Sequence, residues 1–369
     1  MINKKRFLFY LEHPAKYHFH RIQINTLKSN GHQVDIVINT KDILEELVIN
    51  EGWDYTNLFP NTRKIKGLHV YLAAFISLFK TIFKLYKYTY GKRYDLFFGD
   101  ALVYIGRLKG VPSFYPTDDV LAAVPEQRVF FIPANFIIAP EITDIGKYKR
   151  KKIAYKGYKA LAHLHPNHFK PDRNKLIDQF KNSKRFFIIR CTGFGATHDI
   201  NKRGVDDDIL NAIIKILEPL GDILISSERE LPNELRKYQT PINKNDVSHY
   251  IAFSDLFIGD STTMCTESAV LGVPTVEFDE YFYEIEQMLE LEKKYDLISC
   301  FRTNETEKCL MKISELVNNS NAKAEQLKKA EKFFYDMIDV SSFITWILDE
   351  YPNSYEEFKK NPNIQYRFK

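Results

Sequence analysis

The sequence predicts an α/β protein built from two domains, each formed around a parallel β-sheet. Short apolar runs alternate with amphipathic segments along most of the chain, as expected when helices connect parallel strands. The 369 residues exceed what one hydrophobic core usually serves. The alternation restarts after the polar stretch Pro166–Pro171, which contains Pro and His, and we place the domain junction there.

The first half contains apolar runs that predict strands and longer segments that predict helices. The expected strands are Arg6–Leu11, Val34–Asn39, Asp95–Gly99, Pro112–Tyr115 and Phe136–Ala139. The expected helices are Tyr17–Asn30, Asp42–Glu51, His69–Tyr90 and Tyr104–Lys109. The mostly basic run Lys147–Lys152 is typical of a solvated loop, and contact with phosphates is the alternative.

The second half repeats the alternation and then becomes helical. Its expected strands are Arg185–Arg190, Asp222–Ile225, Leu256–Ile258 and Thr275–Phe278. Its expected helices are Asp207–Leu217, Val247–Phe253, Glu284–Lys293, Glu305–Asn318 and Asn321–Ile338, followed by the aromatic tail Ser341–Tyr351. The two halves share no detectable sequence repeat.

Composition and charge argue against several classes of protein. A net charge of +4 suits anionic substrates but is too weak to indicate a nucleic-acid partner. The four cysteines are scattered without a CxxC pair, so we expect a reduced, cytoplasmic protein with no metal site. No G-x-G-x-x-G follows the first strand, which argues against NAD-dependent oxidoreduction. No stretch approaches the ~20 apolar residues of a membrane span.

The expected helix His69–Tyr90 allows two interpretations. It is apolar, with Lys80, Lys84 and Lys87 spaced so that they fall on one face. We expect an amphipathic helix that covers the sheet while its lysines reach water. The alternative is a helix that lies on a membrane surface.

The stretch Asp255–Phe278 contains a strand, a turn, a short helix and a strand. The turn carries the hydroxyl residues Ser261, Thr262 and Thr263, and Glu267 opens the small-residue helix. Backbone N–H groups at the start of a helix that follows a parallel strand favour anions, and Glu267 offers acceptors for sugar hydroxyls. In the alternative interpretation, Ser261 or Thr262 only caps the helix.

Two sets of residues carry a resemblance to known families. Gly259–Phe278 resembles the nucleotide-sugar-binding segment of GT-B-fold proteins, which include glycosyltransferases and non-hydrolysing UDP-N-acetylglucosamine 2-epimerases. Over about residues 5–280 the chain resembles the DUF354 family, on the loop Leu11–Phe19 after the opening strand and on the segment Tyr155–Pro166.

The resemblance implies a GT-B-like fold, in which two Rossmann-like parallel-sheet domains face each other across a cleft. We expect residues 1–167 to form the acceptor-side domain and residues 168–340 to form the nucleotide-sugar-binding domain. A helical tail, residues 341–369, is expected to pack back on the first domain.

Ligands of such folds bind at the carboxyl ends of the strands, so residues that directly follow strands are the candidates. Arg190 suits a diphosphate, with a salt bridge as the equally weighted alternative. DUF354 members have a His-Asp pair where this chain has His198-Asp199. The candidate nucleotide-sugar-binding residues are Arg190, His198, Asp199, Ser227, Glu228, Asp260, Ser261, Thr262, Thr263 and Glu267.

The candidate catalytic residues follow strands of the first half. They are His13, Asp100, Asp118 and Asp119. His13 follows the first strand and is a candidate base for an acceptor hydroxyl. Gly99-Asp100 resembles the Gly-Asp of the 2-epimerases, whose strand-end carboxylates do acid–base work. A strand-end Asp is also an ordinary helix cap, and the epimerases' His-Arg motif is missing from Cys191–Asp199.

The function we expect is a metal-independent glycosyltransferase with a nucleoside-diphosphate sugar donor, UDP-linked, in surface polysaccharide or glycan biosynthesis. One alternative is an epimerase that resembles the UDP-N-acetylglucosamine 2-epimerases, and another is an inert sugar-nucleotide-binding protein. The expected partners are the nucleotide sugar and a glycan or lipid-linked acceptor, with no cofactor and no nucleic acid. We expect a cytoplasmic location, with weak peripheral contact at the inner membrane face left open.

Overall fold

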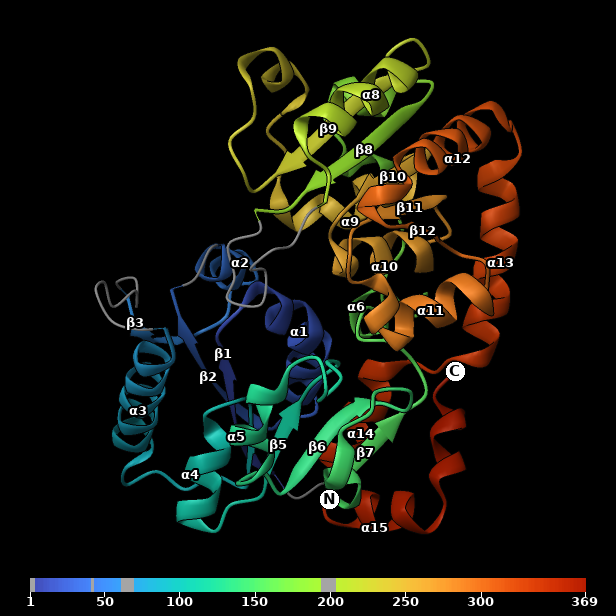
Figure 1. The fold of residues 1–369 in the computed structure, drawn as a ribbon. Helices are drawn as coiled ribbons and strands as arrows, with labels where there is room; N and C mark the ends of the chain where they lie inside the picture. Colours follow the sequence, from blue (N-terminus) through green and yellow to red (C-terminus); the bar gives the residue numbers. More distant parts are fainter. Residues whose placement is uncertain (1–3, 41–42, 61–69, 194–203) are drawn as a thin grey trace. The chain divides into compact units, whose positions relative to one another are not determined.

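The computed structural model describes residues 4–40, 43–60, 70–193 and 204–369, without the side chains of residues 70 and 71. The chain divides into two compact units (Figure 1). The first unit contains residues 1–165 and 337–369, and the second contains residues 166–336.

The first unit is built around a parallel sheet of seven strands in the order β3-β2-β1-β4-β5-β6-β7. The strands are β1 (Arg6–Leu11), β2 (Gln33–Asn39), β3 (Thr56–Phe59), β4 (Leu96–Phe98), β5 (Ser113–Pro116), β6 (Phe136–Pro140) and β7 (Lys152–Tyr155). The helices are α1 (Pro14–Ser29), α2 (Leu44–Asn50), α3 (Val70–Thr89), α4 (Leu102–Lys109), α5 (Arg128–Phe131), α6 (Leu161–Leu164), α14 (Val340–Asp349) and α15 (Asn353–Lys360).

Strand β1 shows why this sheet needs helices on both faces. Leu8 and Tyr10 belong to a buried cluster with residues of α3 and α4. The intervening Phe9 packs instead against the ring of His20 on α1, with ring centroids 5.4 Å apart. Side chains alternate between the faces of a strand, so the continuous apolar run of β1 is buried on both sides.

The segment 337–369 is fastened to the first unit by buried polar contacts. Ser341 Oγ donates to the carbonyl oxygen of Ala162 at 2.6 Å. Asp349 pairs with His32 at 2.7 Å, and Lys5 Nζ donates to the carbonyl of Asp349 at 2.5 Å. Helix α14 also packs against α1 and α6. This segment is therefore an integral part of the first unit.

The second unit is built around a parallel sheet of five strands in the order β12-β11-β10-β8-β9. The strands are β8 (Phe186–Cys191), β9 (Asp222–Ser227), β10 (Leu256–Gly259), β11 (Thr275–Phe278) and β12 (Ser299–Phe301). The helices are α7 (Asp178–Asn182), α8 (Asp207–Leu217), α9 (Val247–Phe253), α10 (Thr262–Val270), α11 (Glu286–Lys293), α12 (Thr306–Asn318) and α13 (Ala322–Asp336).

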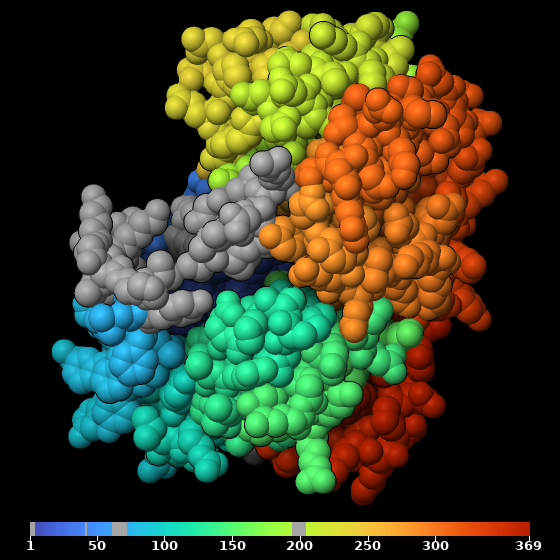
Figure 2. Space-filling model, in the orientation of Figure 1, coloured from blue at the N-terminus to red at the C-terminus, as the bar shows by residue number. Residues whose placement is uncertain are grey.

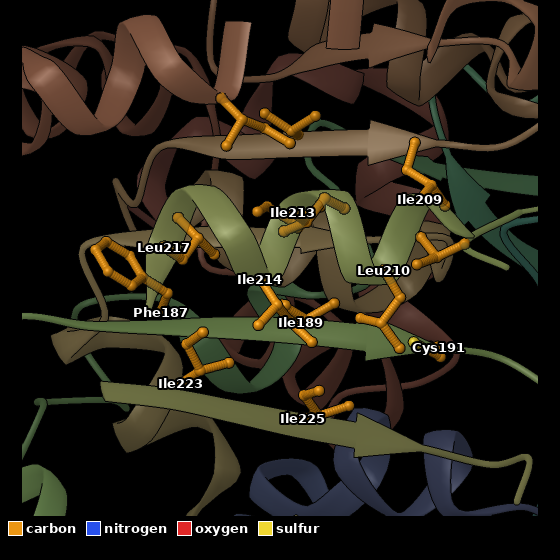
Figure 3. Close-up of a cluster of buried hydrophobic side chains, with 14 of the residues drawn as sticks. Phe187, Ile189, Cys191, Ile209, Leu210, Ile213, Ile214, Leu217, Ile223 and Ile225 are labelled. Carbon is orange, nitrogen blue, oxygen red and sulfur yellow. The ribbon is translucent and has the colours of Figure 1, made fainter. Parts of the chain in front are cut away.

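Helix α8 provides much of the core of the second unit. Its apolar residues Ile209, Leu210, Ile213, Ile214 and Leu217 recur at helical spacing and pack on the sheet (Figure 3). Asp206 caps the helix by accepting hydrogen bonds from two backbone N–H groups of its first turn. The cap and the apolar face together fix α8 across β8 and β9.

Several element boundaries differ from the sequence-based expectations. Helix α1 begins at Pro14, earlier than Tyr17, because Pro suits the first turn and His13 caps the helix. Helix α10 begins at Thr262, so Glu267 lies inside the helix and does not open it. Residues 41 and 42, 61–69 and 194–203, on which parts of other expected elements fall, lie outside the described residues.

Helix α3 covers the sheet and exposes its lysines as expected, and it also exposes large apolar residues that were not predicted. Leu85 is buried, and Leu78 and Ile82 pack against the same cluster. The opposite face exposes Phe75, Phe79 and other large apolar residues in addition to lysines. No helix within the described ranges is long and apolar enough to cross a membrane.

Candidate functional site

The candidate residues form two sets, each at the carboxyl ends of the strands of one unit. In the first unit, Gly99 ends β4 with φ of 133°, a conformation that favours glycine. A Cβ atom at this position would lie 2.7 Å from the carbonyl oxygen of Tyr10 on β1. Gly99 therefore lets β4 end close against β1, and this places Asp100 directly beyond the sheet edge.

Asp100 forms an ion pair with Lys16 of α1. The Nζ–Oδ1 distance is 3.1 Å, and Nζ also donates to the carbonyl oxygen of Pro116 at 3.0 Å. Burial alone would lower the pKa of Lys16, but the charges of Asp100 and Glu12 outweigh it and raise the pKa. The charged ammonium form of Lys16 is therefore favoured, and it lies beside a strand-end carboxylate.

Asp118 and Asp119 follow β5 and have different partners. Asp118 pairs with Lys159 at 2.9 Å. Asp119 accepts a hydrogen bond from Gln127 Nε2 at 2.6 Å. Burial and the neighbouring charge of Asp118 raise the pKa of Asp119.

These five groups form what we call the carboxylate–lysine cluster: Lys16, Asp100, Asp118, Asp119 and Lys159. A small recess is lined by both lysines and Asp118, together with Phe19, Pro116, Thr117 and Tyr155. The sequence pointed to the aspartates because they follow strands. It gave no comparable signal for Lys16, which lies on α1, or for Lys159, which follows β7.

His13 follows β1 and caps α1. Its Nδ1 accepts a hydrogen bond from the backbone N–H of Ala15 at 3.1 Å. A neutral imidazole whose Nδ1 accepts carries its proton on Nε2. In this arrangement Nε2 is a donor, so His13 can act as a general base only after its capping bond is released.

In the second unit, Arg190 lies at the end of β8 and forms a salt bridge with Glu228. Its Nη1 also donates to Ser226 Oγ at 2.8 Å. A Cβ atom on Gly259 would lie 2.9 Å from the Cβ of Arg190, so glycine is needed where β10 passes this side chain. The salt-bridge alternative for Arg190 is thus observed, and its partner is another of the candidate residues.

Asp260 directly follows β10 and is buried. Its Oδ1 accepts from the backbone N–H of Thr192 at 2.7 Å, and its Oδ2 accepts from that of Val205 at 3.0 Å. Burial raises the pKa of Asp260 to about 6, although the two backbone hydrogen bonds act in the opposite direction. Asp260 therefore joins Thr192, just after β8, and Val205, just before α8, to the end of β10.

Ser261, Thr262 and Thr263 form the start of α10. Ser261 occupies the N-cap position, and among the described residues its side chain makes no capping hydrogen bond. Thr263 is exposed, and Glu267 is half-buried within the helix. The first N–H groups of α10 are therefore not satisfied by the side chain at its cap.

Ser227 and Glu228 lie in the turn after β9. Ser227 Oγ donates to the carbonyl of Arg229 at 2.7 Å, a local turn contact. Arg229 in turn pairs with Asp207 at 2.6 Å. His198 and Asp199 lie outside the described residues.

Two acidic residues near the end of β11 were missed from the sequence. Glu277 is 0% exposed, and its carboxyl group interacts with the side chains of Thr262 and Asp279. Burial and the charge of Asp279 raise its pKa well above the usual range. Asp279 accepts from the backbone N–H of Tyr281 at 2.6 Å. Glu277 gave no signal because it sits inside an apolar run.

The described residues offer no arrangement of three or more His, Cys, Asp or Glu side chains suited to a metal ion. The four cysteines are buried and free. Burial raises the pKa of the Cys191 and Cys309 thiols to about 12. Buried thiols of this kind are poor nucleophiles.

Comparison with solved structures finds several chains with the same fold. The S. aureus MnaA–UDP structure aligns with a TM-score of 0.65 at 13% identity, covering 95% of this chain and 97% of that chain. A UDP-N-acetylglucosamine 2-epimerase gives 0.61 at 10% identity, covering 94% and 96%. The calicheamicin glycosyltransferase CalG4 gives 0.58 at 10% identity, covering 97% and 99%.

These likenesses show that the two units form a GT-B fold. No curated protein sequence matches the chain. The model of one family, described as a protein of unknown function (DUF354), matches residues 76–342. The chain belongs to the DUF354 family.

Proposed function

We propose that this protein is a glycosyltransferase that uses a nucleoside-diphosphate sugar, UDP-linked, as its donor. The observation that carries the proposal is the end of β10. There Asp260 is buried and hydrogen-bonded to backbone on both sides, and α10 begins with no side-chain capping bond from Ser261 among the described residues. Such a helix start offers N–H donors and a positive dipole end to a diphosphate.

Each candidate in the second unit has a role in this proposal. The N–H groups and hydroxyls of Ser261–Thr263 bind the diphosphate and stabilise its charge as it leaves the sugar. Glu267 accepts hydrogen bonds from the hydroxyls of the nucleoside. Arg190 turns from Glu228, which is more than half exposed, towards a phosphate oxygen.

Proton transfer from the acceptor hydroxyl is assigned to the first unit. His13 Nδ1 is occupied by the hydrogen bond that caps α1. The carboxylates of the carboxylate–lysine cluster are therefore the better candidates for the base. The ion pairs with Lys16 and Lys159 keep Asp100 and Asp118 beside positive charge. The acceptor is a glycan or a lipid-linked sugar, and the pathway is surface polysaccharide biosynthesis.

One observation favours a second candidate function, epimerisation of the sugar nucleotide. The carboxylate–lysine cluster places both carboxylates and ammonium groups at one sheet edge, a set suited to removing and returning a proton. Against it, the residues that directly follow β8, Thr192 and Gly193, lack the His-Arg motif of the epimerases. We therefore rank transfer first.

One experiment separates the alternatives. The protein is incubated in D₂O with a panel of nucleotide sugars, with and without glycan or lipid-linked acceptors, and products are followed by NMR. Transfer predicts release of the nucleoside diphosphate only when acceptor is present. Deuterium at C2 of the sugar, abolished by Asp100→Asn, would instead establish the epimerase. Binding without turnover would leave an inert sugar-nucleotide-binding protein.

A further inference from the structure

Helix α3 has one face that the fold does not bury. The side of the helix that packs on the sheet carries Leu78, Ile82 and Leu85. Thr81 is also buried on this side. Through these side chains, α3 covers the first sheet.

The opposite side carries a stripe of large apolar residues in contact with solvent. Phe75, Phe79 and Phe83 are 64%, 67% and 65% exposed. The members of this stripe, which we call the aromatic stripe, are Leu72, Phe75, Phe79, Phe83 and Tyr86. At 3.6 residues per turn they fall within about 80° of arc, and the stripe runs for about 21 Å. Figure 2 shows α3 (light blue) at the surface of the first unit.

Such a stripe is far more than the scattered apolar residues of an ordinary surface. Burying a phenylalanine side chain stabilises a protein by about 1.5–3 kcal/mol, and the three exposed phenylalanines do not contribute this free energy. Contiguous exposed apolar surface of this extent marks a site where something binds.

The charges beside the stripe indicate what binds. Lys80 and Lys87 are exposed and fall on the arc next to the aromatic stripe. Lys84 lies further round, where it donates to the carbonyl of Leu58 and stands 3.9 Å from the centroid of the Phe59 ring. The sequence of α3 contains no acidic residue. An apolar stripe bordered by lysines matches the acyl chains and phosphates of an anionic lipid surface.

We propose that α3 docks the protein on an anionic membrane, with the aromatic stripe in the acyl–headgroup boundary and Lys80 and Lys87 at the phosphates. The helix lies in the plane of the surface and does not cross it, since Leu78, Ile82 and Leu85 are packed on the sheet. A second copy of the chain fits the stripe less well. Pairing α3 with α3 would bring lysines together with no carboxylate on the helix to oppose them.

The test is co-sedimentation with vesicles of phosphatidylcholine alone and of phosphatidylcholine with phosphatidylglycerol. The full chain is expected to bind the anionic vesicles only. Phe79→Ser/Phe83→Ser should reduce binding at least about tenfold. The matched control Met311→Ser/Tyr335→Ser changes side chains that are 72% and 77% exposed on α12 and α13, and it should bind like wild type.

The lysines are tested in the same way. Lys80→Gln/Lys87→Gln should weaken binding to anionic vesicles by about fivefold for each charge removed. The control Lys328→Gln/Lys332→Gln removes the same number of exposed charges from α13 and should have no effect. Raising the salt concentration should weaken wild-type binding in parallel.

Insertion is tested separately with Phe79→Trp. Quenching of its added fluorescence by brominated lipids is expected in anionic vesicles. The proposal fails if wild type does not bind, if the phenylalanine variant binds equally well, or if the new Trp is not quenched. It also fails if light scattering shows a wild-type dimer that Phe79→Ser/Phe83→Ser converts to monomer. None of these readouts depends on glycosyl transfer.

Discussion

The Oδ2 atom of Asp260 accepts a hydrogen bond from the backbone N–H of Val205 at 3.0 Å, across 55 residues of sequence. Its other oxygen holds the N–H of Thr192. One carboxylate therefore joins both ends of the segment between β8 and α8 to the end of β10. An amide cannot accept from both N–H groups, because its nitrogen is itself a donor.

This geometry predicts the effect of Asp260→Asn. A buried N–H would be left without an acceptor, and we expect the free energy of unfolding to fall by about 1–3 kcal/mol in urea titrations at pH 7.5. Affinity for UDP should fall as well. The matched control is Asp255→Asn, at the other end of the same strand, where Asp255 accepts from the N–H of Phe186. It should cost stability but leave UDP affinity unchanged, and equal affinities for both variants would contradict the site.

Glu267 is predicted to bind the nucleoside through its hydroxyls. Glu267→Ala should weaken UDP binding about tenfold in calorimetry, the loss expected for one charge-assisted hydrogen bond, while thermal unfolding stays near wild type. Glu315→Ala, an exposed glutamate on α12, serves as the control. Wild-type affinity in Glu267→Ala would remove this residue from the site.

Lys16 and Asp100 are expected to be energetically coupled. Lys16→Met leaves the carboxylate of Asp100 without its partner and should destabilise the fold by about 3 kcal/mol. The double variant Lys16→Met/Asp100→Asn removes both charges and should recover at least half of that loss. Additive effects in this double-mutant cycle, measured by urea unfolding, would show that the pair contributes no coupling.

Because His20 is buried, we expect the folding stability of the protein to fall at acidic pH. His20 is buried among the rings of Phe9, Phe19 and Phe98, and burial lowers its pKa to about 3, although a hydrogen bond with Gln23 acts in the opposite direction. The unfolded chain binds a proton near pH 6.5, so this group's contribution to stability is complete above that pH and declines below it.

Between pH 7 and pH 5 the loss from His20 should be about 2 kcal/mol. Replacing it by Gln removes the titration, so unfolding of His20→Gln should depend less steeply on pH by this amount, whatever its absolute stability. Identical pH profiles for wild type and variant would show that His20 is accessible to protons in the folded state.

For Glu277, the contribution to folding stability should change with pH in the opposite direction to that of His20. The pKa of Glu277 is raised by burial, so the folded state favours the protonated form and stability from this group declines as pH rises. Glu277→Gln keeps the shape without the charge. We expect the variant to exceed wild type in melting temperature at pH 8 and to match it more closely at pH 5. A variant that is less stable at pH 8 would mean that the charged form is stabilised in the fold.

The central strands could be predicted from the sequence because they are buried on both faces and read as continuous apolar runs. Strands β3, β7 and β12 were not predicted, and all three lie at edges of their sheets. Edge strands are half-buried, so polar and charged residues such as Asn57 and Lys152 interrupt the pattern. Lys152 was assigned to a basic loop for this reason.

Some residues of the candidate sites could be predicted from the sequence and others could not. Residues that follow strands could be identified from chain order alone, because topology places strand ends together. Their partners could not, since Lys16 and Lys159 reach Asp100 and Asp118 from other elements. The exposed aromatic residues of α3 were not predicted, because an apolar helix gives the same sequence pattern whether a given face is buried or exposed.

The division of the chain has a consequence for synthesis on the ribosome. The second unit is contiguous, residues 166–336, whereas the first needs residues 337–369 to complete it. The partners of Ser341 and Asp349 are made early in synthesis. The carbonyl of Ala162 and the side chains of His32 and Lys5 can form these contacts only after residues 341 and 349 have been made. The half of the protein that is made first is therefore the half that finishes folding last, and a nascent chain halted before residue 337 would present the second unit complete and the first unit open.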